Sequence, residues 1–335
     1  MEYRKLGASG MLVSPICLGT MMFGSQTDEA ESRRIIAAAH FAGVNIIDTA
    51  DVYNDGRSEE IVGRAIAAQR DDWILATKLG NRMGQGPHQA GLSRHWMFLA
   101  VEGSLRRLGT DRIDILYLHR EDLGTPLDVT VRAAGDLIAS GKVRHYGLSN
   151  FRSWRVAEVC ALCDRLGIPR PVVSQPYYNA MNRMPEAEHL PACGFYGLGV
   201  IPYSPLARGV LTGKYAPDAP PPEGTRAGRN DKRIMESEWR AESLRIAQTL
   251  KDHALARGTT PIAFAVAWVL NNALVTGAIA GPRTMAQFES YLAALDYRFT
   301  PDDEALVDSL VPIGHPSTPG YNDPAYPLEG RPVRG

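Results

Sequence analysis

The stretch Ile113-Asp-Ile-Leu-Tyr-Leu-His119 is apolar through most of its length and ends in an ionisable side chain. Strands of a parallel barrel are buried on both faces, so a polar residue is tolerated mainly where the strand emerges into the loops that carry chemistry. The same pattern recurs along the chain, and its strand-end residues are Asp48, Lys78, His119, Asn150, Gln175, Ser204 and the turn from Gly281 to Thr284. This recurrence predicts an α/β fold, a (β/α)8 TIM barrel with a site at the carboxyl ends of its strands.

Strand and helix patterns alternate on both sides of this stretch. The strands are expected at residues 16–19, 45–50, 73–79, 113–119, 143–150, 171–175, 200–204 and 274–280. Helices between them are predicted to stop at glycines such as Gly109 and Gly167, because glycine readily adopts the left-handed conformation of a helix end. Ser58 is expected to cap the second helix, and Thr260 with Pro261 to start the helix at 262–271.

Three segments lie outside this alternation. Residues 3–6 and 11–13 are predicted to form an N-terminal β-hairpin that closes the bottom of the barrel. A long loop at 216–235, after the seventh strand, contains four prolines, and the 311–335 C-terminal tail contains six. Loops longer than about 12 to 15 residues are usually functional lids or disordered segments. Each of the two is therefore a candidate lid at the barrel mouth. The whole chain, 1–335, is expected to be one barrel domain.

The bulk composition excludes several classes of protein. The 335 residues are 44% hydrophobic and 22% charged, with a formal net charge of -1, which disfavours nucleic acid or an anionic membrane as a partner. The chain shows no basic leader and no apolar run of about 18 to 20 residues, so a soluble, cytoplasmic protein is predicted. Four cysteines do not make a disulfide framework, and Cys160 and Cys163 share the phase of a buried helix face, which is favoured over a redox or zinc site.

Four polar residues near the strand ends have complementary chemistry. Three neighbouring strands would bring Asp48, Lys78 and His119 to one patch, with Tyr53 in the loop after Asp48. A tyrosine has a reference pKa of about 10, but a nearby ammonium favours the phenolate and lowers that pKa. The aspartate can offset the burial of the lysine charge, and the histidine can hold a substrate oxygen for protonation. The other histidines show no metal-ligand spacing, so no metal site is expected.

The run Gly43-Val-Asn-Ile-Ile-Asp48-Thr-Ala-Asp-Val-Tyr53, followed by Glu59 and Gly63, resembles the signature of the aldo-keto reductase superfamily. The resemblance covers about residues 3 to 300 and is nearest to the microbial branch related to potassium-channel β subunits. It continues through Ala76-Thr-Lys78, Leu116-Tyr-Leu-His119, Gly147-Leu-Ser-Asn150, Gln175, Tyr203-Ser-Pro-Leu206, Gly209-Val-Leu-Thr-Gly-Lys214 and Gly281-Pro-Arg-Thr284.

This resemblance implies an NADP(H)-dependent oxidoreductase that reduces an aldehyde or ketone to an alcohol. Tyr53 would protonate the carbonyl oxygen, Lys78 would lower the pKa of Tyr53, Asp48 would pair with Lys78, and His119 would orient the carbonyl. Hydride would come from the nicotinamide cofactor. The residues implied to bind that cofactor, besides Asp48, are Gly19, Thr20, Met21, Ser149, Asn150, Gln175, Tyr203, Ser204, Pro205, Leu206, Arg208, Gly209, Lys214, Gly281, Pro282, Arg283, Thr284 and Gln287.

Within that set, the resemblance assigns each residue to a part of the cofactor. Ser149, Asn150 and Gln175 would hold the carboxamide, Tyr203 would stack on the nicotinamide ring, and residues 204–214 would cover the pyrophosphate. Gly19 and Thr20 would line the nicotinamide end. No Gly-x-Gly-x-x-Gly turn follows a strand, which a Rossmann site would need but this family does not.

The residues expected to bind the adenosine part of the cofactor differ in part from the family pattern. Arg283 and Thr284 would meet the 2′-phosphate of NADPH, since a guanidinium fork and a helix N-terminus both suit a phosphate. Relatives commonly have Gln-x-x-Glu-Asn after this turn to hold the adenine, whereas this chain has Gln287-Phe-Glu-Ser290-Tyr291. Tyr291 could stack on the base or pack on the helix surface.

Two other classes of function stay open at this point. One is a slow-turnover NADP(H)-binding regulatory subunit resembling the channel β subunits, which would show slow NADPH release and negligible multiple turnover. The other is a metal-dependent barrel hydrolase, which a metal assay would detect. The expected partner is a small-molecule carbonyl substrate of undetermined identity, and the sequence leaves a homo-oligomer open.

Overall fold

The computed structural model describes residues 1–327, and the last part of the 311–335 tail, 328–335, lies outside the described residues. The chain divides into two compact units. The first comprises Met1–Tyr177, Glu188–Tyr203 and Leu270–Leu292, and the second comprises Tyr178–Ala187, Ser204–Val269 and the chain from Ala293 onward. That the whole chain acts as one domain, with its tail over the barrel mouth, stays a prediction.

Eight parallel strands of the first unit form the barrel. The sheet has the order β10-β3-β4-β5-β6-β7-β8-β9, and backbone hydrogen bonds from Thr276 to Val200 (2.8 Å) and from Ile279 to Pro202 (3.0 Å) join its two ends. The predicted (β/α)8 TIM barrel is confirmed. The strands are β3 (Ile16–Gly19), β4 (Ile46–Asp48), β5 (Ile74–Leu79), β6 (Ile113–Leu118), β7 (Val143–Ser149), β8 (Val173–Gln175), β9 (Gly199–Val200) and β10 (Ala278–Ala280).

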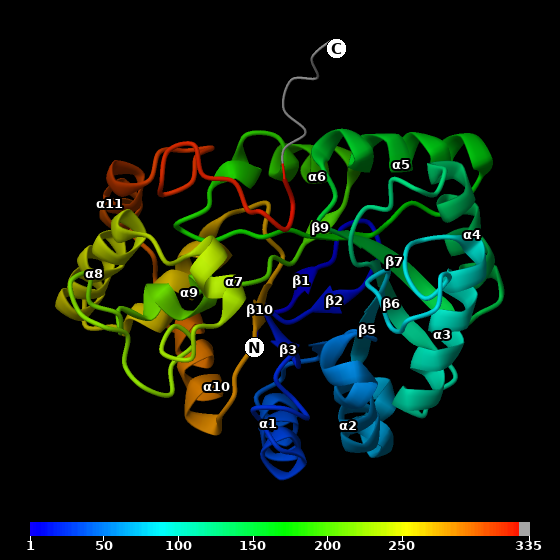
Figure 1. Cartoon of the computed structure of the whole chain (residues 1–335), viewed down its shortest axis with the longest axis horizontal. Helices are drawn as coiled ribbons and strands as arrows, with labels where there is room; N and C mark the ends of the chain where they lie inside the picture. The colour runs from blue at the N-terminus through cyan, green and yellow to red at the C-terminus, as the bar shows by residue number, and fades with distance from the viewer. Residues whose placement is uncertain (328–335) are drawn as a thin grey trace. The chain divides into compact units, whose positions relative to one another are not determined.

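Helices of the first unit follow the strands, and Figure 1 shows α2, α3 and α4 in succession along one flank of the sheet. Gly109 and Gly167 end α3 and α5 in the left-handed conformation, as predicted. The predicted cap at Ser58 is wrong: the residue lies inside α2 and its hydroxyl contacts Thr20 and Thr49. The helices are α1 (Glu29–Phe41), α2 (Arg57–Ile66), α3 (Arg94–Leu108), α4 (Leu127–Ala139), α5 (Ser153–Leu166), α6 (His189–Tyr196) and α10 (Met285–Leu292).

The predicted N-terminal hairpin is present and packs on the barrel core. β1 (Arg4–Lys5) pairs antiparallel with β2 (Leu12–Val13), and Leu6 and Val13 belong to the same buried cluster as residues of the barrel strands. Gly7 has a positive φ of 52° and lies against the backbone at the start of β9. A Cβ added to it would stand 2.5 Å from the Gly199 nitrogen. Only glycine therefore allows this turn to dock where the strands begin.

The second unit is largely helical, and its elements are α7 (Lys232–Ser237), α8 (Ala241–Ala256), α9 (Pro261–Asn271), α11 (Pro301–Leu310) and the 3-10 turns η3 (Met184–Glu186), η4 (Ala207–Thr212) and η5 (Ala293–Leu295). Thr260 caps α9 as predicted, because its hydroxyl accepts the Ala263 amide at 3.1 Å. The predicted loop at 216–235 ends earlier than expected, since Asp231 caps α7 from Lys232 onward. Within residues 1–327, every helix is too short or too polar to cross a membrane.

Candidate active site

A buried lysine stands at the centre of the site. Lys78, on β5, has no exposed surface, and its ammonium donates to the Asp48 carboxylate, to the Thr49 carbonyl at 2.9 Å and to the Tyr53 hydroxyl at 3.2 Å. Burial alone lowers the pKa of Lys78, but the charges and hydrogen bonds of Asp48 and Tyr53 more than offset this and raise it. Gln175 donates to the second carboxylate oxygen of Asp48 at 2.9 Å, so both oxygens are held.

Tyr53 begins the 3-10 turn η1 (Tyr53–Gly56) in the loop after β4. Its amide donates to the Ala50 carbonyl at 3.2 Å. The next residue, Asn54, adopts a positive φ of 51° and donates through its side-chain amide to the carbonyls of Met21 (3.0 Å) and Phe23 (2.7 Å). The loop that carries the phenol is therefore tied to the loop after β3, which limits the positions that the hydroxyl can adopt.

His119 completes the group as the first residue after β6. Its amide donates to the Leu79 carbonyl at 2.9 Å, and its ring meets the Tyr53 ring edge to face, with centroids 6.1 Å apart. Burial, and then the positive charges of Lys78 and Arg120, lower the pKa of His119 well below its usual value. The imidazole is therefore neutral at physiological pH and can donate through one ring nitrogen only.

A second cluster of predicted residues lies at the ends of β7 and β8. Asn150, with φ +57, donates to the His119 carbonyl at 2.9 Å and to the Ser149 hydroxyl at 3.1 Å, and accepts from the Tyr203 hydroxyl at 2.7 Å. The Tyr203 ring is stacked on Tyr177, with centroids 5.5 Å apart. Through Asn150, the residues predicted to bind the carboxamide and the nicotinamide ring are connected to His119.

The residues predicted at the nicotinamide end have structural partners of their own. An added Cβ at Gly19 would lie 2.5 Å from the Ile279 side chain, so close strand packing explains this glycine. Thr20 is fully buried, and both its amide (3.0 Å) and its hydroxyl (3.1 Å) donate to the Asp48 carbonyl. Met21, in contrast, is exposed.

Gly281, Pro282, Arg283, Thr284 and Gln287 lie together at the start of α10. The Arg283 guanidinium donates to Gln26 at 3.1 Å, and the Arg283 amide donates to Gln287 at 2.8 Å. The Thr284 hydroxyl accepts the Gln287 amide at 3.4 Å. Farther along the helix, the Ser290 hydroxyl donates to the Ala286 carbonyl and the Tyr291 side chain is only 8% exposed, which favours packing over base stacking for this tyrosine.

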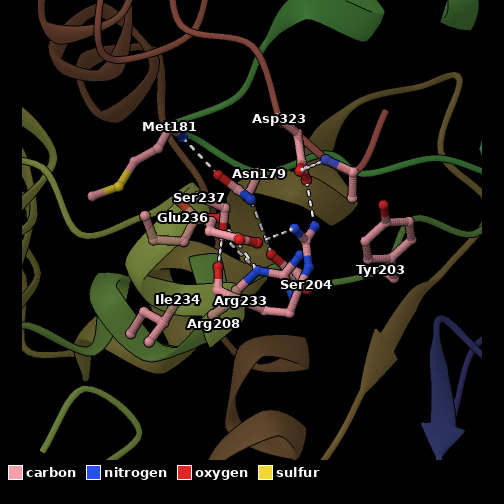
Figure 2. A network of polar contacts seen from close by, with 12 residues as sticks. Asn179, Met181, Tyr203, Ser204, Arg208, Arg233, Ile234, Glu236, Ser237 and Asp323 are labelled. Atoms are coloured by element: carbon pink, nitrogen blue, oxygen red, sulfur yellow. Dashed lines mark hydrogen bonds and ion pairs between the residues drawn. The ribbon is translucent and has the colours of Figure 1, made fainter. Parts of the chain in front are cut away.

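The predicted pyrophosphate segment belongs to the second unit. Figure 2 shows Arg208 pointing toward Ser237, whose hydroxyl accepts its Nε at 2.8 Å. The Ser204 carbonyl accepts from Asn179 at 3.0 Å, and Lys214 lies over the Tyr215 ring at 5.2 Å. The remaining predicted members are Pro205, Leu206 and Gly209, of which Leu206 is buried and Gly209 has φ +98.

Strained backbone gathers at these predicted positions. Among residues 1–327, seven residues other than glycine have a positive φ, and six of them occur beside Tyr53, at Asn150, or within 204–208; the seven are Asn54, Asp55, Asn150, Ser204, Ala207, Arg208 and Asn230. Such conformations cost of order 1 to 3 kcal/mol each and cluster at functional sites. This observation is independent of any motif.

Sequence reasoning missed two residues of the site. Asn81, two residues after β5, contacts His119 Nδ1 with its amide nitrogen at 3.0 Å. Asp51 is fully buried, and its backbone amide donates to the Lys78 carbonyl at 3.1 Å. Neither of its carboxylate oxygens has a side-chain hydrogen-bond partner within residues 1–327. A polar residue just beyond a strand end was the available signal for Asn81. For Asp51 the motif gave no signal, because its burial depends on tertiary packing.

Comparisons with known proteins agree with this geometry. The model of the aldo/keto reductase family matches residues 15–312. The chain is 37% identical over 96% of its length to a probable voltage-gated potassium channel subunit beta of Oryza sativa subsp. japonica, and covers 100% of that protein. It is 33% identical to the versiconal hemiacetal acetate reductase of Aspergillus parasiticus (93% of this chain, 98% of the relative) and 32% identical to an L-glyceraldehyde 3-phosphate reductase of Escherichia coli O157:H7 (94% and 93%). The chain belongs to the aldo/keto reductase family.

Proposed function

We propose that the protein is an NADP(H)-dependent oxidoreductase that reduces an aldehyde or ketone to an alcohol, with Tyr53 as the general acid. The observation that carries this proposal is the contact of one buried ammonium, Lys78, with both Asp48 and the Tyr53 hydroxyl. The family and its reductase-named members support oxidoreductase chemistry, and the family generally binds NAD(P)H.

The side chains of this protein would carry out the proton transfer to the carbonyl oxygen. Tyr53 would give its phenolic proton to the carbonyl oxygen, and the Lys78 ammonium at 3.2 Å would stabilise the phenolate left behind. His119 would donate a hydrogen bond to the same oxygen and so hold it next to the phenol. Solvent would return a proton to Tyr53 after the alcohol leaves. A bound nicotinamide cofactor would supply the hydride to the carbonyl carbon.

The donor set of the first unit fits a nicotinamide. Ser149, Asn150 and Gln175 offer amide and hydroxyl groups, which can both donate to and accept from a carboxamide, and Tyr203 offers an aromatic ring beside them. Arg283 offers a guanidinium fork next to the first turn of α10, which suits a 2′-phosphate. A pyrophosphate role for 204–214 stays a prediction. A small-molecule carbonyl substrate in a soluble, cytoplasmic setting is part of this proposal.

A second candidate function is a slow-turnover NADP(H)-binding regulatory subunit. The similarity to the rice potassium channel subunit, which extends over that whole protein, favours it. NADPH oxidation with a panel of aliphatic, aromatic and dicarbonyl compounds separates the two functions. Sustained multiple turnover supports the reductase, whereas slow NADPH release with a single turnover supports the regulatory subunit.

The decisive variant is Tyr53→Phe, which removes the proton donor and keeps the ring. We expect kcat to fall by at least about 10² to 10⁴-fold, the usual contribution of general acid catalysis. NADPH affinity, measured by fluorescence titration, should barely change. If the variant keeps more than a tenth of the wild-type kcat where chemistry limits the rate, Tyr53 is not the acid.

A further inference from the structure

The contact between Asn81 and His119 decides which ring nitrogen of the histidine carries the proton. The amide nitrogen of Asn81 lies 3.0 Å from His119 Nδ1. A side-chain amide nitrogen can only donate, so Nδ1 must accept, and in a neutral imidazole the proton is then on Nε2. The hydrogen bond therefore leaves Nε2–H as the only donor of the ring.

The groups around His119 keep the ring neutral, which this arrangement requires. Burial of the ring disfavours an imidazolium most, and the positive charges of Lys78 on β5 and Arg120 in the loop after β6 act in the same direction. Tyr53 faces the ring edge to face, and Asn150 binds the His119 carbonyl at 2.9 Å. None of these contacts uses Nδ1, so Asn81 is the group that sets its role.

We propose that Asn81 is a positioning residue that fixes the Nε2–H tautomer of His119, so that the imidazole presents a hydrogen-bond donor to the carbonyl oxygen beside Tyr53. This inference rests on the proposed reductase function for its catalytic consequence, but the tautomer itself does not depend on turnover. The acceptor at Nδ1 also fixes the direction of the ring, because rotation about the Cβ bond would break a 3.0 Å contact.

Nitrogen-15 NMR of the histidine rings tests the tautomer without any substrate. The His119 signals are assigned from the spectrum of His119→Gln, and wild-type His119 should show a protonated Nε2 and an unprotonated Nδ1 across pH 6 to 8. Asn81→Asp, which has nearly the same shape, replaces the donor with an acceptor. Its His119 should show a protonated Nδ1, and the pKa of His119 should rise because a carboxylate stabilises the imidazolium.

Gln89→Glu is the matched control, because it makes the same amide-to-carboxylate change in the same loop, where Gln89 accepts the Gly86 amide at 2.9 Å. It should leave the His119 spectrum unchanged. A wild-type His119 protonated on Nδ1, or an Asn81→Asp spectrum that keeps Nε2–H alone, would overturn the proposal. Either result would leave the assignment of Tyr53 as the acid untouched.

Kinetics supply the second readout. At pH 8 the Asn81→Asp variant should lose about 10² to 10³-fold in kcat, the usual cost of removing one donor to a developing oxyanion. Activity should return in part as the pH falls, since an imidazolium donates from both nitrogens again. A uniform loss at every pH would indicate a merely structural defect and refute the positioning role.

Discussion

Asp48 and Asp51 are the same residue type, three positions apart and both buried, yet the structure places them in opposite electrostatic situations. Asp48 is held through both oxygens, by Lys78 and by Gln175. The carboxylate of Asp51 has no hydrogen bond to another side chain within residues 1–327, and burial followed by the negative charge of Glu59 raises its pKa from 3.8 to about 8. The charges of Arg107 and Lys78 act in the opposite direction, but burial outweighs them. A buried carboxylate is therefore compensated where a cation bonds to it directly, as Lys78 does to Asp48, and favours its neutral form where none does.

The largest effect on stability should come from removing the cation that is bonded to Asp48. Lys78→Met would leave Asp48 as an uncompensated buried charge, which typically costs about 3 to 5 kcal/mol of stability. It should also lower kcat by removing the partner of the Tyr53 phenolate. Urea unfolding at pH 7 measures the first effect, and steady-state kinetics measure the second.

Two double variants test whether these losses arise from the orphaned Asp48 charge and from the lost contact with Tyr53. Asp48→Asn with Lys78→Met removes the orphaned charge and should recover part of the lost stability. Tyr53→Phe with Lys78→Met should be little worse in kcat than Tyr53→Phe alone, because both changes act on one proton transfer. Losses that simply multiply would show that Lys78 and Tyr53 work independently.

Asp51, which has no such cation bonded to it, should make the stability of the protein depend on pH. Because the pKa of Asp51 is raised to about 8 in the folded protein, folding favours its protonated form. That contribution to stability is complete below the unfolded pKa of about 4 and is lost progressively as the pH rises through about 8. Asp51→Asn should therefore be more stable than wild type at pH 9, on the order of a few kcal/mol, with a much smaller difference at pH 5.

Urea unfolding at the two pH values checks this. Glu59→Gln is the informative companion, because it removes a negative charge that raises the pKa of Asp51. The pKa of Asp51 should fall, so less stability should be lost between pH 5 and pH 9 than in wild type. An unchanged loss would show that the Glu59 charge contributes nothing. Wild-type stability that is flat over this range would mean that Asp51 is ionised and has a partner.

The smallest effect is expected at Arg283, whose charge is partly exposed, unlike the buried carboxyl groups of the two aspartates. Arg283→Ala should weaken NADPH binding by about 10 to 150-fold, since a charge-assisted hydrogen bond contributes about 1.5 to 3 kcal/mol. NADH, which lacks the 2′-phosphate, should bind almost as before. Raising the salt from 0.1 M to 1 M, which shortens the Debye length from about 10 Å to about 3 Å, should reproduce part of the loss. Equal losses for both cofactors in fluorescence titration would exclude Arg283 as the phosphate contact.

Much of the fold followed from sequence because strand burial and helix ends are local signals. Ile16–Gly19 was predicted to the residue, and Gly109 and Gly167 end their helices as expected. The strand expected to reach Ser204 is regular only as far as Val200, because Pro202 has no amide to donate. Its pairing nevertheless continues, since the amides of Ile201 and Tyr203 donate to the carbonyls of Ser174 and Pro176, both at 3.0 Å. Short-range patterns therefore find the extent of this segment but not the break in its regular pairing.

The sequence predicted the site residues at the strand ends but not those whose contacts depend on loop conformation. Asp48, Lys78 and His119 meet because neighbouring parallel strands end at one edge, a consequence of the topology alone. The Asn81 contact and the isolation of Asp51 depend on loop conformation and on which side chains fill the space around them. A hydroxyl such as that of Ser58 can cap a helix or bind two neighbouring threonines, and only the folded chain decides between these.

The pairing of the first barrel strand with the last has a consequence for synthesis. β3 ends at Gly19 and its neighbour β10 ends at Ala280, so nearly the whole chain must leave the ribosome before the sheet can close. At about 5 to 20 residues per second, the edge of β3 that faces β10 stays unpaired for on the order of tens of seconds, and that of β9 for about 4 to 16 seconds. Nascent chains truncated before β10 should therefore depend on chaperones, and recombinant yield should improve when translation and folding are slowed together at low temperature.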